Sequence, residues 1–115
     1  MFGSDYPELF FACTIEDGMV RVSGEIDMNT APTLYEALVT CAQEIGRLPT
    51  IDLSGVSYFD SSGAQALVEA GKMDPAGTGA ANIVGVRPNV MRIMRMVGLD
   101  ELFEIHSTGE TEPEP

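Results

Sequence analysis

The chain has 115 residues, of which 44% are hydrophobic, so it is long enough for one domain with a single modest core. Eighteen acidic residues against six basic ones give a net charge of −12 at pH 7, which repels nucleic acid and anionic lipid. Because no apolar run approaches the roughly 20 residues of a membrane helix and the first residues lack a signal-peptide pattern, we expect a cytoplasmic protein without membrane insertion.

The opening segment predicts a β-hairpin. Residues 8–16 and 18–26 are rich in β-forming side chains that alternate in places, and Asp17-Gly18 stands between them as a turn signal. Two strands joined by so short a turn pair antiparallel. The sheet is therefore expected to begin with an antiparallel pair.

An amphipathic helix is predicted next. Asn29 or Thr30 caps its start, Pro32 is tolerated in its first turn, and Gly46 marks its end. Apolar side chains recur between these signals at spacings of 4, 3 and 4 residues, at Leu34, Leu38, Cys41 and Ile45. We expect the stripe that they form to face the core.

A further strand and helix follow. Residues 50–53 and 56–59 supply the strand, and Asp60 leads from it into the helix. Small and apolar residues lie on one side of this helix, at Ala64, Leu67, Val68 and Gly71. Residues 72–80 contain an Asp-Pro pair and several glycines, which predicts an exposed loop.

The last third of the chain predicts one more strand and helix. Residues 81–86 form the strand, Asn89 caps a helix that Gly98 closes, and residues 102–105 form an edge strand. Residues 107–115 carry three glutamates, two prolines and no large apolar residue. Such a segment cannot bury enough apolar surface to offset the conformational entropy lost on ordering, so we expect a disordered acidic tail.

These elements predict an α/β fold with one domain over residues 1–106. Its mixed sheet holds about five strands, begins with the antiparallel hairpin, continues by parallel crossovers and carries three to four α-helices. Loops that follow parallel strands gather at one edge of a sheet. The loop with Asp27 and the loop with Ser61 and Ser62 are therefore expected to be neighbours.

Ser61 carries the hypothesis for a functional site. It stands where an apolar strand passes into a helix, so local sequence indicates an N-cap. A phosphate on its hydroxyl would meet unpaired backbone N–H groups and the positive end of the helix dipole. Gly63 is expected to permit a close approach where a side chain would intrude. Asp27 either accepts hydrogen bonds from backbone N–H groups near Asn29 or contacts a partner, and the residues alone leave both open.

Two sequence motifs lie at the ends of the strands before these loops. The first is SGEID (residues 23–27) followed by TAPTL (30–34), and the second is DLSGVSYFDSSG (52–63). Together they resemble the signatures of the bacterial anti-sigma factor antagonists with a STAS domain. Residues 82–99 resemble the last strand and helix of that family, so the resemblance spans roughly residues 8–106.

The resemblance implies a STAS-like domain and a partner-switching mechanism. The unmodified protein would bind an anti-sigma factor that is also a serine kinase, which frees the sigma factor. Phosphorylation at Ser61, or as the alternative at Ser62, would switch this binding off, and a PP2C-type phosphatase would restore it. The implied partner-binding residues are Asp27, Asn29, Thr30, Asp60, Ser61, Ser62 and Gly63. The added charge of about −1.5 to −2 next to two aspartates predicts repulsion of an acidic partner surface.

Two other functions fit the sequence less well. A non-switching STAS subunit that regulates a transporter or a multiprotein signalling assembly would use the fold without the modification. A small serine hydrolase would need a base beside Ser61, but the lone His106 lies at the far end of the chain and the G-x-S-x-G elbow is absent. No nucleotide-binding glycine motif or His/Cys cluster occurs in the sequence, so no cofactor and no metal are expected.

Cysteine and arginine positions leave smaller questions. Cys13 and Cys41 are too few and too far apart for a disulfide scaffold, and no basic neighbour favours a thiolate, so a redox role is not expected. Arg87, Arg92 and Arg95 supply half of the basic residues within nine positions. They form either a solvated helix face or a binding surface for phosphate or an acidic partner.

Overall fold

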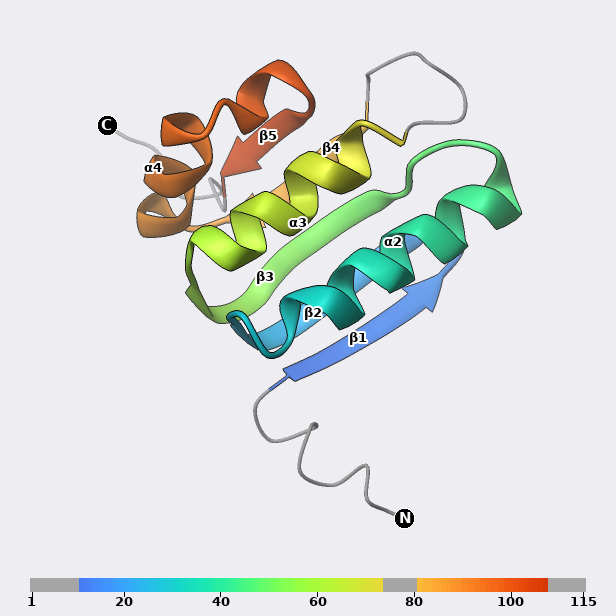
Figure 1. Cartoon of the computed structure of the whole chain (residues 1–115), viewed down its shortest axis with the longest axis horizontal. Coiled ribbons are helices and arrows are strands. Elements are labelled where there is room, and N and C mark those ends of the chain that lie inside the picture. Colours follow the sequence, from blue (N-terminus) through green and yellow to red (C-terminus); the bar gives the residue numbers. More distant parts are fainter. Residues whose placement is uncertain (1–10, 74–80, 108–115) are drawn as a thin grey trace.

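The computed structural model describes residues 11–73 and 81–107, which form a five-stranded sheet in the order β1-β2-β3-β4-β5 with helices packed against it (Figure 1). β1 and β2 pair antiparallel, and every later pair is parallel. This arrangement confirms the predicted α/β fold with a mixed sheet. The elements in chain order are β1 (Phe11–Glu16), β2 (Met19–Ile26), α2 (Ala31–Ile45), β3 (Thr50–Phe59), α3 (Ser61–Gly71), β4 (Asn82–Val86), α4 (Pro88–Met96), the 3-10 helix η1 (Leu99–Glu101) and β5 (Glu104–Ser107).

The hairpin turn forms where the sequence predicts it. Asp17 and Gly18 have φ angles of 51° and 75°, the left-handed conformation that a two-residue hairpin turn requires. The first strand is described from Phe11, so the expected start at residues 8–10 lies outside the described residues. The turn places β1 at one edge of the sheet, where it pairs with β2.

β3 is a single strand, although its apolar pattern breaks in the middle. Its buried residues follow a spacing of two and then of three, at Ile51, Leu53, Val56 and Phe59. The pairing with β2 shifts register at two places in this region, as a β-bulge does. Gly55 makes the close pairing sterically feasible, because a Cβ there would lie 2.8 Å from the Cβ of Ser23.

Helices α2 and α3 lie side by side over one face of the sheet, and α4 follows β4 toward the β5 edge (Figure 1). Leu34, Leu38 and Cys41 of α2 are buried as predicted, whereas Ile45 is 37% exposed. The prediction that Ile45 faces the core is therefore wrong. It occupies the last position of α2, where the helix ends at Gly46 with a left-handed φ of 78°.

The C-terminal elements differ from the prediction at their boundaries. The expectation that Asn89 caps the last helix is wrong, because α4 begins at Pro88 and the extended Arg87 is its N-cap. Pro88 suits the first helical position, since the amide proton that it lacks has no partner there. The edge strand runs through Ser107, one residue into the predicted tail, while residues 74–80 and 108–115 lie outside the described residues. Among those described, no helix has the length and apolar character to cross a membrane.

Candidate functional site

The ends of β2 and β3 bring two distant segments together. Ile26 and Phe59 are paired across these parallel strands, and the N–H of Asp60 donates to the carbonyl oxygen of Ile26 at 3.3 Å. The residues that follow, Asp27 and Asp60, therefore begin two neighbouring strand-to-helix connections at the same sheet edge. The predicted proximity of these loops is confirmed.

Asp60, not Ser61, caps α3. Its backbone is extended, and its Oδ1 accepts hydrogen bonds from the N–H groups of Ser62 at 2.9 Å and Gly63 at 3.4 Å. The prediction that Ser61 is the N-cap is wrong, because the carboxylate one residue earlier already occupies these donors. Ser61 is instead the first residue of the helix, with an exposed side chain, while Ser62 is half-buried in the first turn.

This cap changes the environment that a phosphate on Ser61 would meet. The sequence suggested that the backbone N–H groups at the start of α3 are unpaired. Those of Ser62 and Gly63 are instead already bound to the Asp60 carboxylate. No ion pair within the described part of the chain involves Asp60 or Asp27. A phosphate would add negative charge beside uncompensated carboxylates, so the helix end would offset less of it.

Gly63 allows the start of α3 to approach the sheet closely. A Cβ at this position would lie 2.6 Å from Cγ2 of Ile26 and 2.8 Å from Cε1 of Phe59. Neither atom can move away without disturbing the buried ends of β2 and β3. The predicted need for a residue without a side chain is confirmed, and Gly63 itself is buried.

The Asp27 connection is held by its own side chains. Oδ1 of Asp27 accepts from the N–H of Asn29 at 2.9 Å and from that of Thr30 at 3.1 Å. The Thr30 hydroxyl accepts from the N–H of Asp27 at 2.9 Å and donates to the carbonyl oxygen of Glu25 at 2.8 Å. The acceptor role considered for Asp27 is therefore present, and Thr30, the N-cap of α2, is tied within the same loop.

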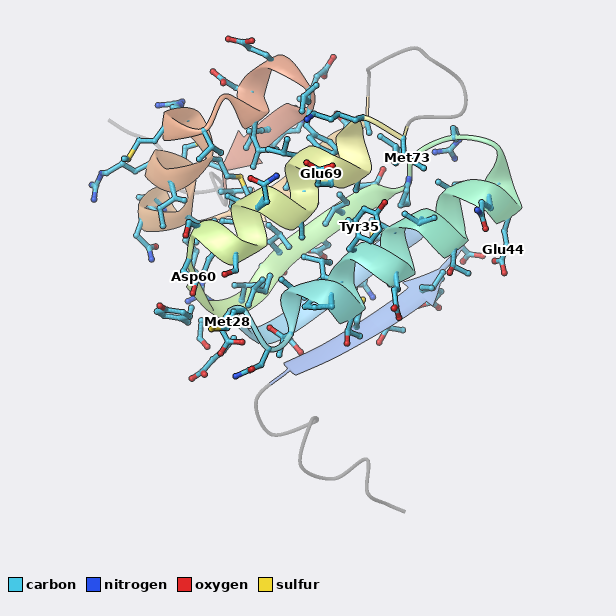
Figure 2. The ribbon with its side chains drawn as sticks, viewed as in Figure 1. Met28, Tyr35, Glu44, Asp60, Glu69 and Met73 are labelled. Carbon is cyan, nitrogen blue, oxygen red and sulfur yellow. The ribbon has the colours of Figure 1, made fainter. Side chains whose placement is uncertain are left out.

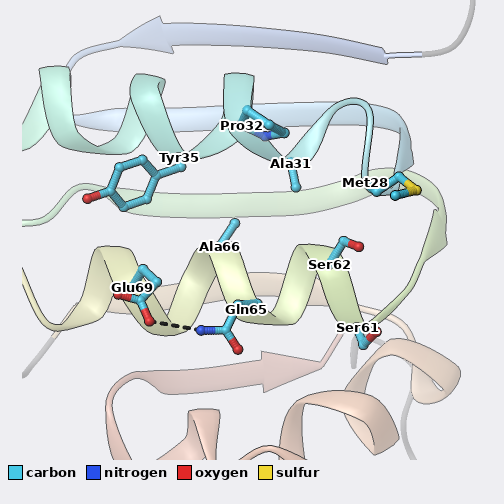
Figure 3. A pocket seen from close by; sticks show the side chains of 9 residues that line it. All are labelled: Met28, Ala31, Pro32, Tyr35, Ser61, Ser62, Gln65, Ala66 and Glu69. Carbon is cyan, nitrogen blue, oxygen red and sulfur yellow. Dashed lines mark hydrogen bonds between the residues drawn. The ribbon is translucent and has the colours of Figure 1, made fainter.

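A groove of about 670 Å³ lies between α2 and α3 and begins at these connections. Ser62 points across it toward α2, and Ser61 lies at the start of α3 (Figure 3). Met28, whose side chain is 74% exposed, lies at the same end. The groove is lined by Met28, Ala31, Pro32, Tyr35, Ser61, Ser62, Gln65, Ala66 and Glu69.

Of the nine lining residues, sequence reasoning placed only Ser61 and Ser62 in the site. It missed the other seven, namely Met28, Ala31, Pro32, Tyr35, Gln65, Ala66 and Glu69. A usable signal was present, since Tyr35 follows Ala31 by one helical turn, and Gln65 and Glu69 follow Ser61 by one and two turns. Figure 2 shows Met28 and Asp60 close to the same end of the two helices. Glu69 accepts a hydrogen bond from Nε2 of Gln65 at 2.8 Å, so the α3 side of the groove is polar and carries a carboxylate away from Ser61.

The parts of a hydrolytic site are not brought together. Nε2 of His106 lies 3.2 Å from Oδ1 of Asn82, at the start of β4, whereas Ser61 follows the opposite end of β3. No group of three or more His, Cys, Asp or Glu side chains suited to a metal ion occurs within residues 11–73 and 81–107. The one histidine of the chain is therefore not placed to act as a base for Ser61.

Both cysteines are free thiols. Burial raises the pKa of Cys13 to about 11, and burial together with the Glu44 carboxylate raises the pKa of Cys41. A raised pKa lowers the fraction of nucleophilic thiolate at neutral pH. The Arg47 guanidinium acts on the pKa of Cys41 in the opposite direction but is outweighed by burial and Glu44.

Comparison with known proteins agrees with this geometry. A family model described as STAS domain matches residues 12–112. The chain is 33% identical over 94 residues to the anti-sigma-B factor antagonist of Bacillus subtilis (strain 168), a match that covers 82% of this chain and 85% of the relative. The protein of the same name from Staphylococcus aureus (strain NCTC 8325 / PS 47) is 32% identical over 93 residues, covering 81% and 86%.

Solved structures show the same likeness. The crystal structure of an anti-sigma factor antagonist from Mycobacterium paratuberculosis superposes with a TM-score of 0.71 and 33% sequence identity, over 87% of this chain and 88% of that one. The anti-sigma factor antagonist SpoIIAA in its unphosphorylated form gives a TM-score of 0.63 over 87% and 90%, and at 20% identity it shows the shared fold. The chain therefore belongs to the STAS domain family, among its anti-sigma factor antagonists.

Proposed function

We propose that this protein is a cytoplasmic anti-sigma factor antagonist whose binding to an anti-sigma factor is switched off by phosphorylation of Ser61. The anti-sigma factor would itself be the serine kinase, and a PP2C-type phosphatase would reverse the modification. The observation that carries the proposal is the exposed Ser61 hydroxyl, which stands at the first position of α3 while Asp60 provides the cap. Relatives at 32–33% identity that are named anti-sigma-B factor antagonists supply the class of partner.

Ser61 is a suitable residue for phosphorylation by a kinase because its side chain does not cap or otherwise stabilise the helix. Its hydroxyl makes no hydrogen bond to another described residue, so a kinase could take the proton and attach a phosphate without breaking the helix start. The nucleotide and the phosphoryl-transfer groups would come from the kinase. The half-buried Ser62 faces the groove and is the less accessible alternative acceptor.

The neighbouring groove supplies a surface for the partner. Met28 is largely exposed at its end, and Ala31, Pro32 and Tyr35 add apolar area along α2. A partner seated there would cover Asp60 and Ser61, which are desolvated on binding. Asp27 and Asn29, in the connection before α2, would lie at the rim of the same contact.

Phosphorylation would act by repulsion rather than by refolding. The phosphate adds about −1.5 to −2 charges to a chain that already carries −12, next to a carboxylate that already fills the helix-end donors. Like charges brought together in an interface cost several kcal/mol. We therefore expect the phosphorylated protein to bind the anti-sigma factor at least about tenfold more weakly, while its fold is unchanged.

The test is incubation with the anti-sigma kinase of the source organism and ATP, followed by intact mass and peptide mapping. One phosphate on Ser61 is expected, with none on Ser61→Ala and an unchanged yield on the matched Ser62→Ala variant. Binding of both forms to the same partner is then measured by calorimetry. A protein that binds but is never phosphorylated would contradict the switch and support a non-switching STAS subunit, and phosphate mapped to Ser62 would move the acceptor.

A further inference from the structure

A second groove, of about 590 Å³, lies between α4 and the end of β5 and shares no lining residue with the groove beside Ser61. Figure 1 shows α4 lying next to β5. Ser107 is fixed at one wall because it pairs with Val86 of β4. The lining residues are Pro88, Met91, Arg92, Arg95, Met96 and Ser107.

The groove combines positive charge with apolar surface. Arg92 and Arg95 are exposed, and no carboxylate of residues 11–73 and 81–107 lies within ion-pair distance of either. By contrast, Arg21 and Lys72 both pair with carboxylates. Met96 is 79% exposed. Its flexible thioether side chain adapts readily to irregular apolar partners.

We propose that this groove binds the chain's own segment 108–115, which follows directly from Ser107. This segment, Thr-Gly-Glu-Thr-Glu-Pro-Glu-Pro, carries carboxylates at Glu110, Glu112 and Glu114 and two proline rings. The carboxylates complement the two arginines, and the proline rings suit the methionine surface. The segment thereby covers two arginines that have no carboxylate partner among the described residues, on an otherwise acidic protein.

The distances allow this contact. Glu110 is three residues beyond Ser107, within a reach of about 10 Å for an extended chain. The nine residues of α4 span about 14 Å, so eight residues are long enough to pass both arginines. Arg92 and Arg95 are three residues apart and therefore share one side of the helix, so that two of the three carboxylates can approach them together.

The tether is what makes a weak contact significant. Exposed ion pairs contribute little individually, so the same peptide as a separate molecule would bind only in the millimolar range. A short flexible tether supplies an effective concentration of the same order, so we expect roughly half of the molecules to hold the segment in the groove. Because the contact depends on exposed charges, salt weakens it. An acidic partner that uses this groove must displace the segment first.

The test uses the full chain and NMR of the Met91 and Met96 methyl groups and the Arg92 and Arg95 amides. Changing Glu110→Gln, Glu112→Gln and Glu114→Gln together removes the carboxylates without shortening the chain. The matched control removes three exposed charges elsewhere, by Glu25→Gln, Glu36→Gln and Glu44→Gln. We expect the first variant to shift the α4 signals and the control to leave them in place.

Two further measurements, with added salt and with a free peptide, test whether the chain's own segment 108–115 occupies the groove beside α4. Raising salt from about 20 to about 300 mM should move the α4 signals of the unchanged protein toward those of the first variant, and should not move those of the variant. A synthetic peptide of residues 108–115 should bind the variant about twofold more tightly, because half of the unchanged protein already holds its own segment. The proposal would be overturned if the tail variant and the control variant shifted the α4 signals equally. It would also be overturned if the peptide bound the tail variant and the unchanged protein with equal affinity. Signals that change on tenfold dilution would assign the groove to the tail of a second copy and equally contradict binding within one chain.

Discussion

The two strand-to-helix connections at the carboxyl edge of the sheet use the same chemistry with different consequences. In each, an aspartate that directly follows a strand accepts hydrogen bonds from the N–H groups of residues two and three positions further along the chain. After β2, the connection takes three further residues, and Thr30 is the N-cap of α2. After β3, Asp60 is itself the N-cap, so α3 begins at once with Ser61.

The first two helical positions show what this difference means. In α2 they are the buried Ala31 and then Pro32, neither of which can accept a phosphate. In α3 they are Ser61 and Ser62, and only Ser61 is exposed. A hydroxyl is available for modification where an adjacent carboxylate has taken over the capping role.

The largest expected effect tests how tightly the second connection is held against the sheet. Gly63→Val places a branched side chain where even a Cβ lies 2.6 Å from Ile26, so we expect a loss of about 3 kcal/mol in the free energy of unfolding. Urea denaturation followed by circular dichroism measures it. The control is Gln65→Val on the exposed side of the same helix, expected to cost less than about 1 kcal/mol. Equal costs would mean that α3 tolerates a shift at its start.

An effect of intermediate size on stability is expected from removing the two aspartate side chains that accept hydrogen bonds in these connections. Asp60→Ala removes the acceptor of two N–H groups, and we expect it to cost about 1 kcal/mol of stability. Asp27→Ala should cost less, because the main-chain oxygen of Asp27 still accepts from Thr30 at 3.2 Å and from Ala31 at 2.8 Å. Thermal unfolding of both variants, with Asp60→Asn as a control that retains the acceptor, gives the order. A larger loss for Asp27→Ala would reverse the comparison.

The smallest expected effect concerns Ser61 itself. Ser61→Ala should change the free energy of unfolding by no more than about 0.5 kcal/mol, because the exposed side chain caps nothing. The same variant should accept no phosphate, so stability and modification are separated at one residue. A loss as large as that of Asp60→Ala, measured in the same denaturation series, would return the capping role to Ser61.

Much of the fold follows from local signals in the sequence. The turn at Asp17-Gly18 and the helix stop at Gly46 were predictable because each needs a backbone conformation that few residues adopt. The proximity of the Asp27 and Ser61 loops was predictable from the rule for parallel strands. The boundary at Ser107 was harder, since a strand end depends on its pairing with β4.

What the sequence alone determined is the order of the elements, the mixed sheet and the edge of the sheet at which the candidate site lies. Only the tertiary structure decided which of two adjacent residues caps α3, that Ile45 is exposed, and which side chains line the groove between α2 and α3. The physical reason is competition, because Asp and Ser are both preferred N-cap residues. Which of Asp60 and Ser61 occupies the N-cap position depends on a one-residue difference in where β3 ends. The groove, likewise, exists only because two helices pack side by side on one face of the sheet.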